Sequence, residues 1–255
     1  KVGAYSIMRV YTLIFGANAG PAADLIEPWL LPLALATLII GMLGAVASTG
    51  LRQQTAYLVV ASVGSLLAAF GLTSSAGIAA GLYYLPHTTF AAAALFLLAD
   101  VIARQRDSVG DRLAPGPALA DSRRLGGLFL ITAVAVAGLP PLSGFLGKFL
   151  TLRAALAHPQ WPWVMGAVLT AGLLSLIALA RTGSLLFYRA DPNLEVPGTP
   201  SNGIGELVPI IGLLLLGLGL TVGAGPLFDQ ARAIAEQMWQ PQLYIQAVLN
   251  PGGSP

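Results

Sequence analysis

A thirty-residue apolar stretch from Gly126 to Ala155 constrains the fold of this chain more than any other feature. As one helix it would measure roughly 45 Å, against a bilayer hydrocarbon core of roughly 30 Å. Near its middle, two adjacent prolines remove two backbone donors and clash with the preceding turn. We therefore expect a membrane-spanning helix that is discontinuous at 138–144. The residues that we expect to form this break are Gly138, Pro140, Pro141 and Gly144.

A basic residue, Lys148, follows the expected break inside the same apolar stretch, and Arg153 lies at the end of that stretch. Irregular backbone at this depth is tolerated only where protein or a water-filled cavity satisfies it. A Lys there costs about 2.5–3.5 kcal/mol on insertion scales, and such residues usually mark an ion or proton pathway. The alternative is a Lys whose amine snorkels to the membrane surface. A broken helix next to a buried Lys favours a transport function.

The composition is that of an integral membrane protein. Hydrophobic residues make up 56% of the chain and charged residues 9%, whereas soluble domains carry about 25% charged residues. The net charge of +2 is too small to indicate a nucleic-acid partner. The chain has no Cys and only two His, and it shows no catalytic triad or phosphate loop. We therefore expect no metal, no cofactor and no enzyme active site.

Hydrophobic runs predict an all-α multi-helix transmembrane bundle. The seven expected spans are 1–17, 29–48, 55–72, 76–103, 126–155, 161–188 and 204–224. We interpret 1–17 as a truncated helix because the chain starts at Lys1 within an apolar run, and 29–224 as a six-span domain. The tail 225–255 contains an amphipathic segment that fits either a helix on the outer interface or contact with a partner subunit.

Basic residues fall mainly on one side of these spans. Loops after the second, fourth and sixth spans hold seven arginines: Arg52, Arg104, Arg106, Arg112, Arg123, Arg124 and Arg189. The opposite side holds Arg153 and Arg232. This bias predicts a multi-pass protein of the cell inner (plasma) membrane, with loop 104–124 in the cytoplasm.

His87 is the second candidate for proton chemistry. It follows Pro86 near the middle of the fourth span, where we expect a second irregularity at Leu85–Thr88. An imidazole titrates near physiological pH, and the hydroxyl of Thr88 could bridge it to water. The alternative is a structural His bonded to a carbonyl. Lys1 is a weaker candidate, since it could simply mark where the sequence begins.

Two further patterns predict structural contacts. Asp100 precedes Arg104 by four residues, so the two can form an ion pair on one helix face. Gly217, Gly219 and Gly223 lie in the last span without a preceding strand. They favour close helix packing over a nucleotide loop.

Three stretches of the sequence carry a family resemblance. They are KVGAYSIMRVYTLIF, LYYLPHTTFAAAALFLLADVIARQR and AGLPPLSGFLGKFLTLRA. They resemble the antiporter-like membrane subunits shared by Mrp-type cation/proton antiporters and respiratory complex I. The phrases ALFLLAD, GDRLAPGPAL and AGLPPLSGFLGK are most similar to the D branch of the Mrp Na⁺/H⁺ antiporter subunits. The resemblance covers Lys1 to about Tyr188.

The resemblance implies a protein of two inverted repeats, of which this chain would contain the second. It assigns Lys148, His87 and Lys1 to a proton pathway, with Thr88 and Ser143 among the bridging hydroxyls. The implied function is proton translocation in a multisubunit monovalent cation (Na⁺)/proton antiporter. Its partners would be other membrane subunits, protons, monovalent cations and the lipid bilayer. The alternatives are a proton-pumping subunit of a complex I-like oxidoreductase and a non-conducting structural subunit.

The sequence departs from the family pattern in two places. Some relatives have Lys four residues after the His, where this chain has Ala91, and this difference fits the D branch. Gln53 and Gln54 stand where many relatives carry a basic residue. Any role of that charge in docking is therefore in doubt here.

Overall fold

The structure is a computed structural model that describes residues 1–15, 19–20, 25–106, 109–189, 204–240, 242 and 248. The regular elements in these ranges are helices. They are α1 (Val2–Ile14), α2 (Glu27–Ala47), α3 (Leu51–Phe70), α4 (Ser75–Gln105), α5 (Ser122–Ala137), α6 (Ser143–Ala155), α7 (Trp161–Phe187), α8 (Ile204–Val222) and α9 (Ala224–Met238).

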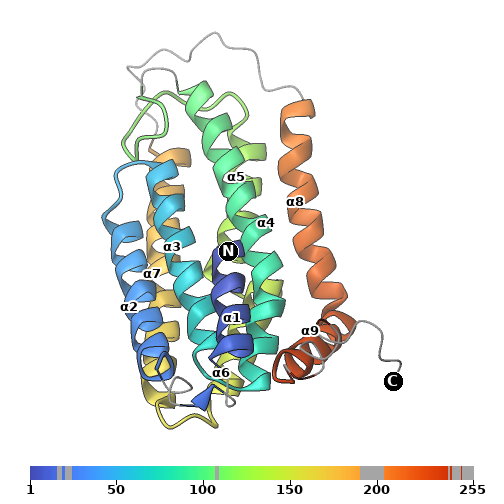
Figure 1. Cartoon of the computed structure of the whole chain (residues 1–255). Helices are drawn as coiled ribbons and strands as arrows, with labels where there is room; N and C mark the ends of the chain where they lie inside the picture. Colours follow the sequence, from blue (N-terminus) through green and yellow to red (C-terminus); the bar gives the residue numbers. More distant parts are fainter. Residues whose placement is uncertain are drawn as a thin grey trace.

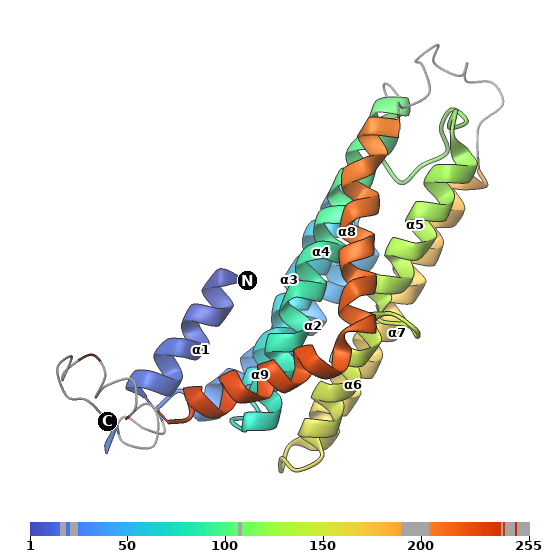
Figure 2. The same ribbon diagram turned by 90° about the vertical axis from the view of Figure 1, so that its right-hand side faces the viewer.

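The long helices run side by side in one bundle (Figure 1). Within the described ranges, five helices are long and apolar enough to cross a membrane, namely α2, α3, α4, α7 and α8. Helices α5 and α6 have 16 and 13 residues, too few to span it singly. They follow each other end to end and together make a sixth crossing (Figure 2). This arrangement confirms the prediction of an all-α membrane bundle with one discontinuous helix.

Helix α4 lies at the centre of the bundle and packs against α3, α5, α6, α8 and α9. Its buried positions include Leu95, Leu98, Ala99 and Ile102. The tightest pair is α2 with α3, where small residues let the backbones approach. A Cβ added to Gly41 would lie 2.6 Å from the backbone nitrogen of Ala61. The apolar composition of the spans therefore forms a packed core rather than a set of isolated helices.

The arginine-rich end of the bundle is tied together by polar contacts. The predicted pair forms, with Arg104 Nη2 2.7 Å from Asp100 Oδ2. Arg52 on α3 contacts the other oxygen of the same carboxylate at 2.7 Å. Glu206 on α8 lies 3.8 Å from Arg104. Helices α3 and α4 thus meet at the exposed carboxylate of Asp100, and α8 joins them through Arg104.

Two expectations about helix geometry are wrong. Helix α4 runs without interruption through Leu85–Thr88, because Pro86 removes only one amide from a helix that neighbours support on several sides. Gly217 and Gly219 on α8 would meet nothing within 4 Å if they carried a Cβ. Their faces are therefore open, because only a small part of α8 packs on the bundle.

The first part of the expected tail forms α9. This helix packs mainly on α4 and buries Ala231, Ala235 and Met238. The ring of Phe228 meets Tyr83 edge to face at 6.3 Å. Contact with the bundle of the same chain is a third arrangement, which neither of the two interpretations of this segment named. Most of the tail beyond Gln240 lies outside the described residues.

Candidate functional site

The helix break is built around a left-handed glycine. Gly138 has φ +75°, a conformation that glycine adopts at little cost. Its amide donates to Ala135, and the amide of Leu139 donates to Val134 at 3.1 Å, which closes α5 with a Schellman motif. Leu142 is extended and α6 begins at Ser143. The break covers 138–142. Gly144, predicted to belong to it, lies in α6, because the chain resumes helical geometry directly after the prolines.

The Lys148 side chain reaches back across this break. Its Nζ donates to the carbonyl of Ala137, the last residue of α5, at 2.6 Å. Carbonyls at a helix C-terminus lack helical donors and carry partial negative charge, so an ammonium stabilises them. A Cβ on Gly138 would lie 2.7 Å from Cδ of Lys148, so only glycine leaves room for this path. The break therefore supplies both the partner and the space for Lys148.

His87 lies on α4 next to the start of α6 and is 3% exposed. Its Nδ1 is 2.8 Å from Oγ of Ser143, and this hydroxyl also donates to the carbonyl of Gly217 on α8 at 3.1 Å. The imidazole stacks on Tyr84 with ring centroids 5.8 Å apart. A Cβ on Gly144 would lie 2.6 Å from Nε2 of His87. The glycine thus lets α6 approach the imidazole closely.

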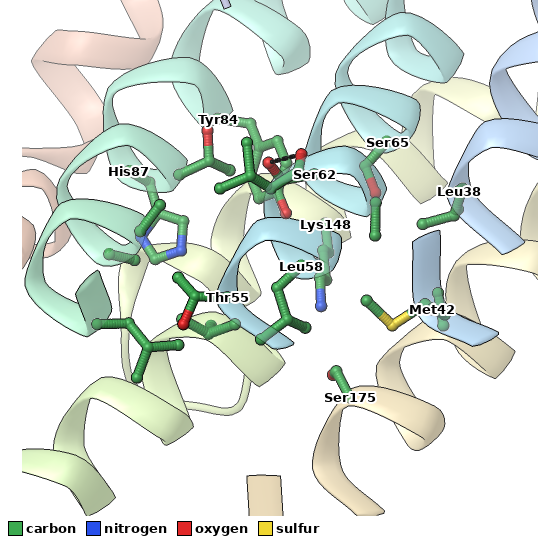
Figure 3. A pocket seen from close by; sticks show the side chains of 18 of the residues that line it. Leu38, Met42, Thr55, Leu58, Ser62, Ser65, Tyr84, His87, Lys148 and Ser175 are labelled. Carbon is green, nitrogen blue, oxygen red and sulfur yellow. Dashed lines mark hydrogen bonds between the residues drawn. The ribbon is translucent and has the colours of Figure 1, made fainter. Parts of the chain in front are cut away.

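Lys148 and His87 line one internal cavity (Figure 3). Its volume open to water-sized spheres is about 40 Å³, and one water needs roughly 10–15 Å³. The cavity can therefore hold a few water molecules. Its other polar lining residues are Thr55, Ser62, Ser65, Tyr84, Thr88 and Ser175. Helices α2, α3, α4, α5 and α7 contribute to the lining besides α6, so the site lies within the bundle.

The structure brings together four of the five residues expected in the pathway. Lys148, His87 and Thr88 line the cavity, and Ser143 is bonded to His87. The Thr88 hydroxyl donates to Leu85 of its own helix at 3.0 Å. Lys1 is half-buried at the start of α1, and the cavity lining within the described residues does not include it.

Sequence reasoning missed several polar groups of the cavity. Thr55, Ser62 and Ser65 on α3 are separated by seven and three residues, which places them on one helix face. Hydroxyl residues at that spacing in an apolar helix indicate a polar face, so these three residues could have been predicted. Ser175 and the carbonyl of Ala137 carry no comparable pattern, because their positions depend on packing between helices.

A second buried polar cluster holds helices together rather than lining the cavity. Gln54 is 2% exposed and donates to the carbonyls of Ala45 on α2 and Ala178 on α7. Its Oε1 accepts from Thr182 at 2.9 Å. Gln54, which stands where many relatives carry a basic residue, thus forms hydrogen bonds that connect α2, α3 and α7.

The described residues show no group of three or more His, Cys, Asp and Glu that could hold a metal ion.

Known proteins resemble the chain along nearly its whole length. It is 34% identical to the D subunit of a Na⁺/H⁺ antiporter of Alkalihalophilus pseudofirmus, over 98% of this chain and 49% of that protein. It is 31% identical to the D subunit of a probable K⁺/H⁺ antiporter of Rhizobium meliloti, over 98% and 51%.

The fold is similar to a chain in the structure of the Mrp complex from Dietzia sp. DQ12-45-1b. The TM-score is 0.82 and the identity 26%, over 98% of this chain and 53% of that one. The chain thus spans about half the length of the relatives it matches. Residues 1–175 match the family described as NADH:quinone oxidoreductase/Mrp antiporter, TM. That match covers more than half of the sequence, and the chain belongs to this family of transmembrane subunits.

Proposed function

We propose that this chain is part of a proton-translocating membrane subunit of a multisubunit Na⁺/H⁺ antiporter. The observation that carries the proposal is the shared cavity of Lys148 and His87 at the helix break. Relatives named as D subunits of Na⁺/H⁺ or K⁺/H⁺ antiporters support a monovalent cation as the coupled ion. Other membrane subunits are the expected partners, in a plasma membrane with loop 104–124 on the cytoplasmic side.

Lys148 is suited to exchange a proton with water. Its ammonium has three donors, of which one goes to Ala137. The other two are available to water in the cavity. When a proton leaves, the remaining amine can keep its bond to Ala137, so the side chain need not move far. The carbonyl therefore acts as an anchor around which the charge state changes.

Ser143 would carry the hydrogen-bond pattern of His87 to α8. A hydroxyl has one proton to donate. When Nδ1 of His87 is protonated it donates to Ser143, which donates to Gly217. When Nδ1 has a lone pair, the Ser143 hydroxyl can turn and donate to it. Gly217 then keeps the 3.2 Å bond from the Thr221 hydroxyl, besides the backbone bonding of its own helix. A change in the protonation of His87 would thus change the hydrogen bonding of Gly217 on α8.

Lys1 enters the proposal through charge. Two ammonium groups in a low-dielectric interior disfavour each other's protonated form. Protonation of Lys1 would therefore promote proton release from Lys148, with His87 between them in the relay. The family resemblance supports this role for Lys1, which lies at the start of α1, a helix that contacts α3 and α9.

The test is Lys148→Ala in the full-length subunit within its complex. Na⁺-dependent proton transport is measured in inverted vesicles with a pH-sensitive dye, and assembly by copurification of the other subunits. We expect transport to fall to background with assembly intact. Arg153→Ala, on the same helix and exposed, is the matched control and should transport normally. Loss of assembly with Lys148→Ala alone would support a scaffold role and overturn the proposal.

A further inference from the structure

A groove lies between α5 and α7. These two helices are on the side of the bundle away from α1 (Figure 2). The volume of the groove is about 790 Å³, far larger than that of the cavity at the helix break. Its lining includes the small residues Gly126, Gly127, Ala133, Ala180 and Gly183, and the rings of Phe187 and Phe129 lie against the first and the last of these glycines. Leu130 and Leu176 add apolar walls and are exposed. The groove lining includes neither Lys148 nor His87. A neighbouring pocket that shares Leu139 and Leu176 with the groove extends to Lys148.

One end of the groove is cationic. Arg123 lines it there, together with Ser122, Ser184 and Tyr188. Arg124 and Arg189 adjoin these residues in the sequence. The groove lining contains no acidic residue, and within the described ranges no carboxylate forms an ion pair with Arg123. The mouth therefore offers a positive charge and hydroxyls above an apolar channel.

The depth of the groove matches one leaflet. On α7 it runs from Leu176 to Tyr188, a rise of roughly 18 Å. One leaflet contributes roughly 15 Å of hydrocarbon. At Leu139 and Leu176 the groove meets a second pocket, beside the turn between α5 and α6, which projects from this face (Figure 2). A transmembrane helix would have to pass that turn, whereas a lipid chain need not extend beyond it.

We propose that the α5–α7 groove binds one anionic phospholipid, with an acyl chain along the glycines and the phosphate at Arg123. Basic pockets between transmembrane helices bind anionic headgroups in this way. The polar groups at the mouth can donate hydrogen bonds to phosphate oxygens, and the open space at Gly127 leaves room for the chain beside the backbone of α5. The lipid would fill the space between α5, the first half of the discontinuous crossing, and its neighbour α7.

The experiment uses the full antiporter complex in vesicles that contain a phosphatidylglycerol or phosphatidylethanolamine probe with a photoreactive acyl chain. Crosslinked peptides are mapped by mass spectrometry. We expect labelling of α5 and α7 by the anionic probe to exceed that by the zwitterionic probe about fivefold, the effect of one Arg near a membrane surface. Equal labelling by both probes would overturn the charge assignment.

Two variants and their controls locate the site. Gly127→Phe fills the groove at a position with open space, and should remove the labelling. Gly166→Phe, also in open space but outside the groove on α7, should not. Arg123→Gln should abolish the headgroup preference, whereas Arg153→Gln should retain it. If Gly127→Phe prevents assembly, the Arg123→Gln comparison still decides. Release of a partner subunit by Gly127→Phe, with lipid labelling unchanged, would identify a protein occupant and overturn the proposal.

Discussion

Two cations, the half-buried Lys148 and the buried Arg106, are both held by backbone carbonyls, yet their surroundings differ. Arg106 is 1% exposed and donates to the carbonyls of Gly110, Arg112 and Ala114. Lys148 donates to one carbonyl and borders a cavity with room for water. The guanidinium is surrounded by fixed acceptors, whereas the ammonium keeps free donors beside water. The first arrangement locks a loop, and the second is the one that our proposal assigns to proton exchange.

The Arg106 site shows what a structural cation looks like in this chain. Its loop folds back on the start of α3, where Leu51 donates to the carbonyl of Asp111 at 2.8 Å and Arg52 donates to its carboxylate. Gly116 packs directly on the guanidinium. Charge and burial alone therefore do not identify a transport residue. The number of fixed partners and the adjoining space separate the two cases.

The largest effect on stability is expected for Arg106→Ala. Three carbonyls lose their donors, and an unsatisfied buried polar group costs about 1–3 kcal/mol, so the folded state should lose at least about 3 kcal/mol. Thermal unfolding of the purified complex and its yield measure this loss. Arg112→Ala, an exposed neighbour, should leave both unchanged. A stable Arg106→Ala complex would contradict the structural role.

Gly144→Ala should have the next largest effect, because it acts on His87, which lines the same cavity as Lys148. The new Cβ would lie 2.6 Å from Nε2 of His87 and closer still to the carbonyl of Ala135. Overpacking of this kind costs about 1–3 kcal/mol, and the displaced imidazole should also reduce antiport. Gly166→Ala, which meets nothing within 4 Å, is the control. Normal transport by Gly144→Ala would show that the close approach is dispensable.

Ser143→Ala should slow antiport about tenfold, equivalent to about 1.4 kcal/mol, the order expected for one buried hydrogen bond lost. It removes the partner of Nδ1 of His87 and one donor to Gly217. Thr221→Val removes the other side-chain donor to the carbonyl of Gly217 and leaves the contacts of His87 unchanged. Initial transport rates in vesicles compare the two variants. Equal rates for both variants would argue against a role of Ser143 at the imidazole.

The smallest effect is expected for Asp100→Asn. Its contacts with Arg52 and Arg104 are exposed, with side-chain exposures between 45% and 55%. Exposed ion pairs contribute about 0–1 kcal/mol, so the melting temperature should change little and antiport should persist. A change as large as that of Arg106→Ala would mean that this network anchors α8 through Glu206.

The features that could be predicted from the sequence are those that arise within one segment, where residues cannot continue a helix or cannot face lipid. The prolines and Gly138 cannot continue a helix, and Lys148 cannot face lipid cheaply, so the break and its cation were predictable. Arg106 could not be distinguished from the other arginines of its loop, because its acceptors depend on how the loop folds back. The open space next to the Cα atom of Gly217 could not be predicted either, because it depends on which side of α8 packs on the bundle.

The most direct test of the central claim is the transport rate of Lys148→Arg. Arginine keeps its charge at any biological pH and can donate to the carbonyl of Ala137, so it preserves the anchor but cannot release a proton. Cation-dependent proton transport by assembled complexes in inverted vesicles should fall to the level of Lys148→Ala. Antiport at the wild-type rate would show that a fixed charge suffices and that Lys148 carries no proton.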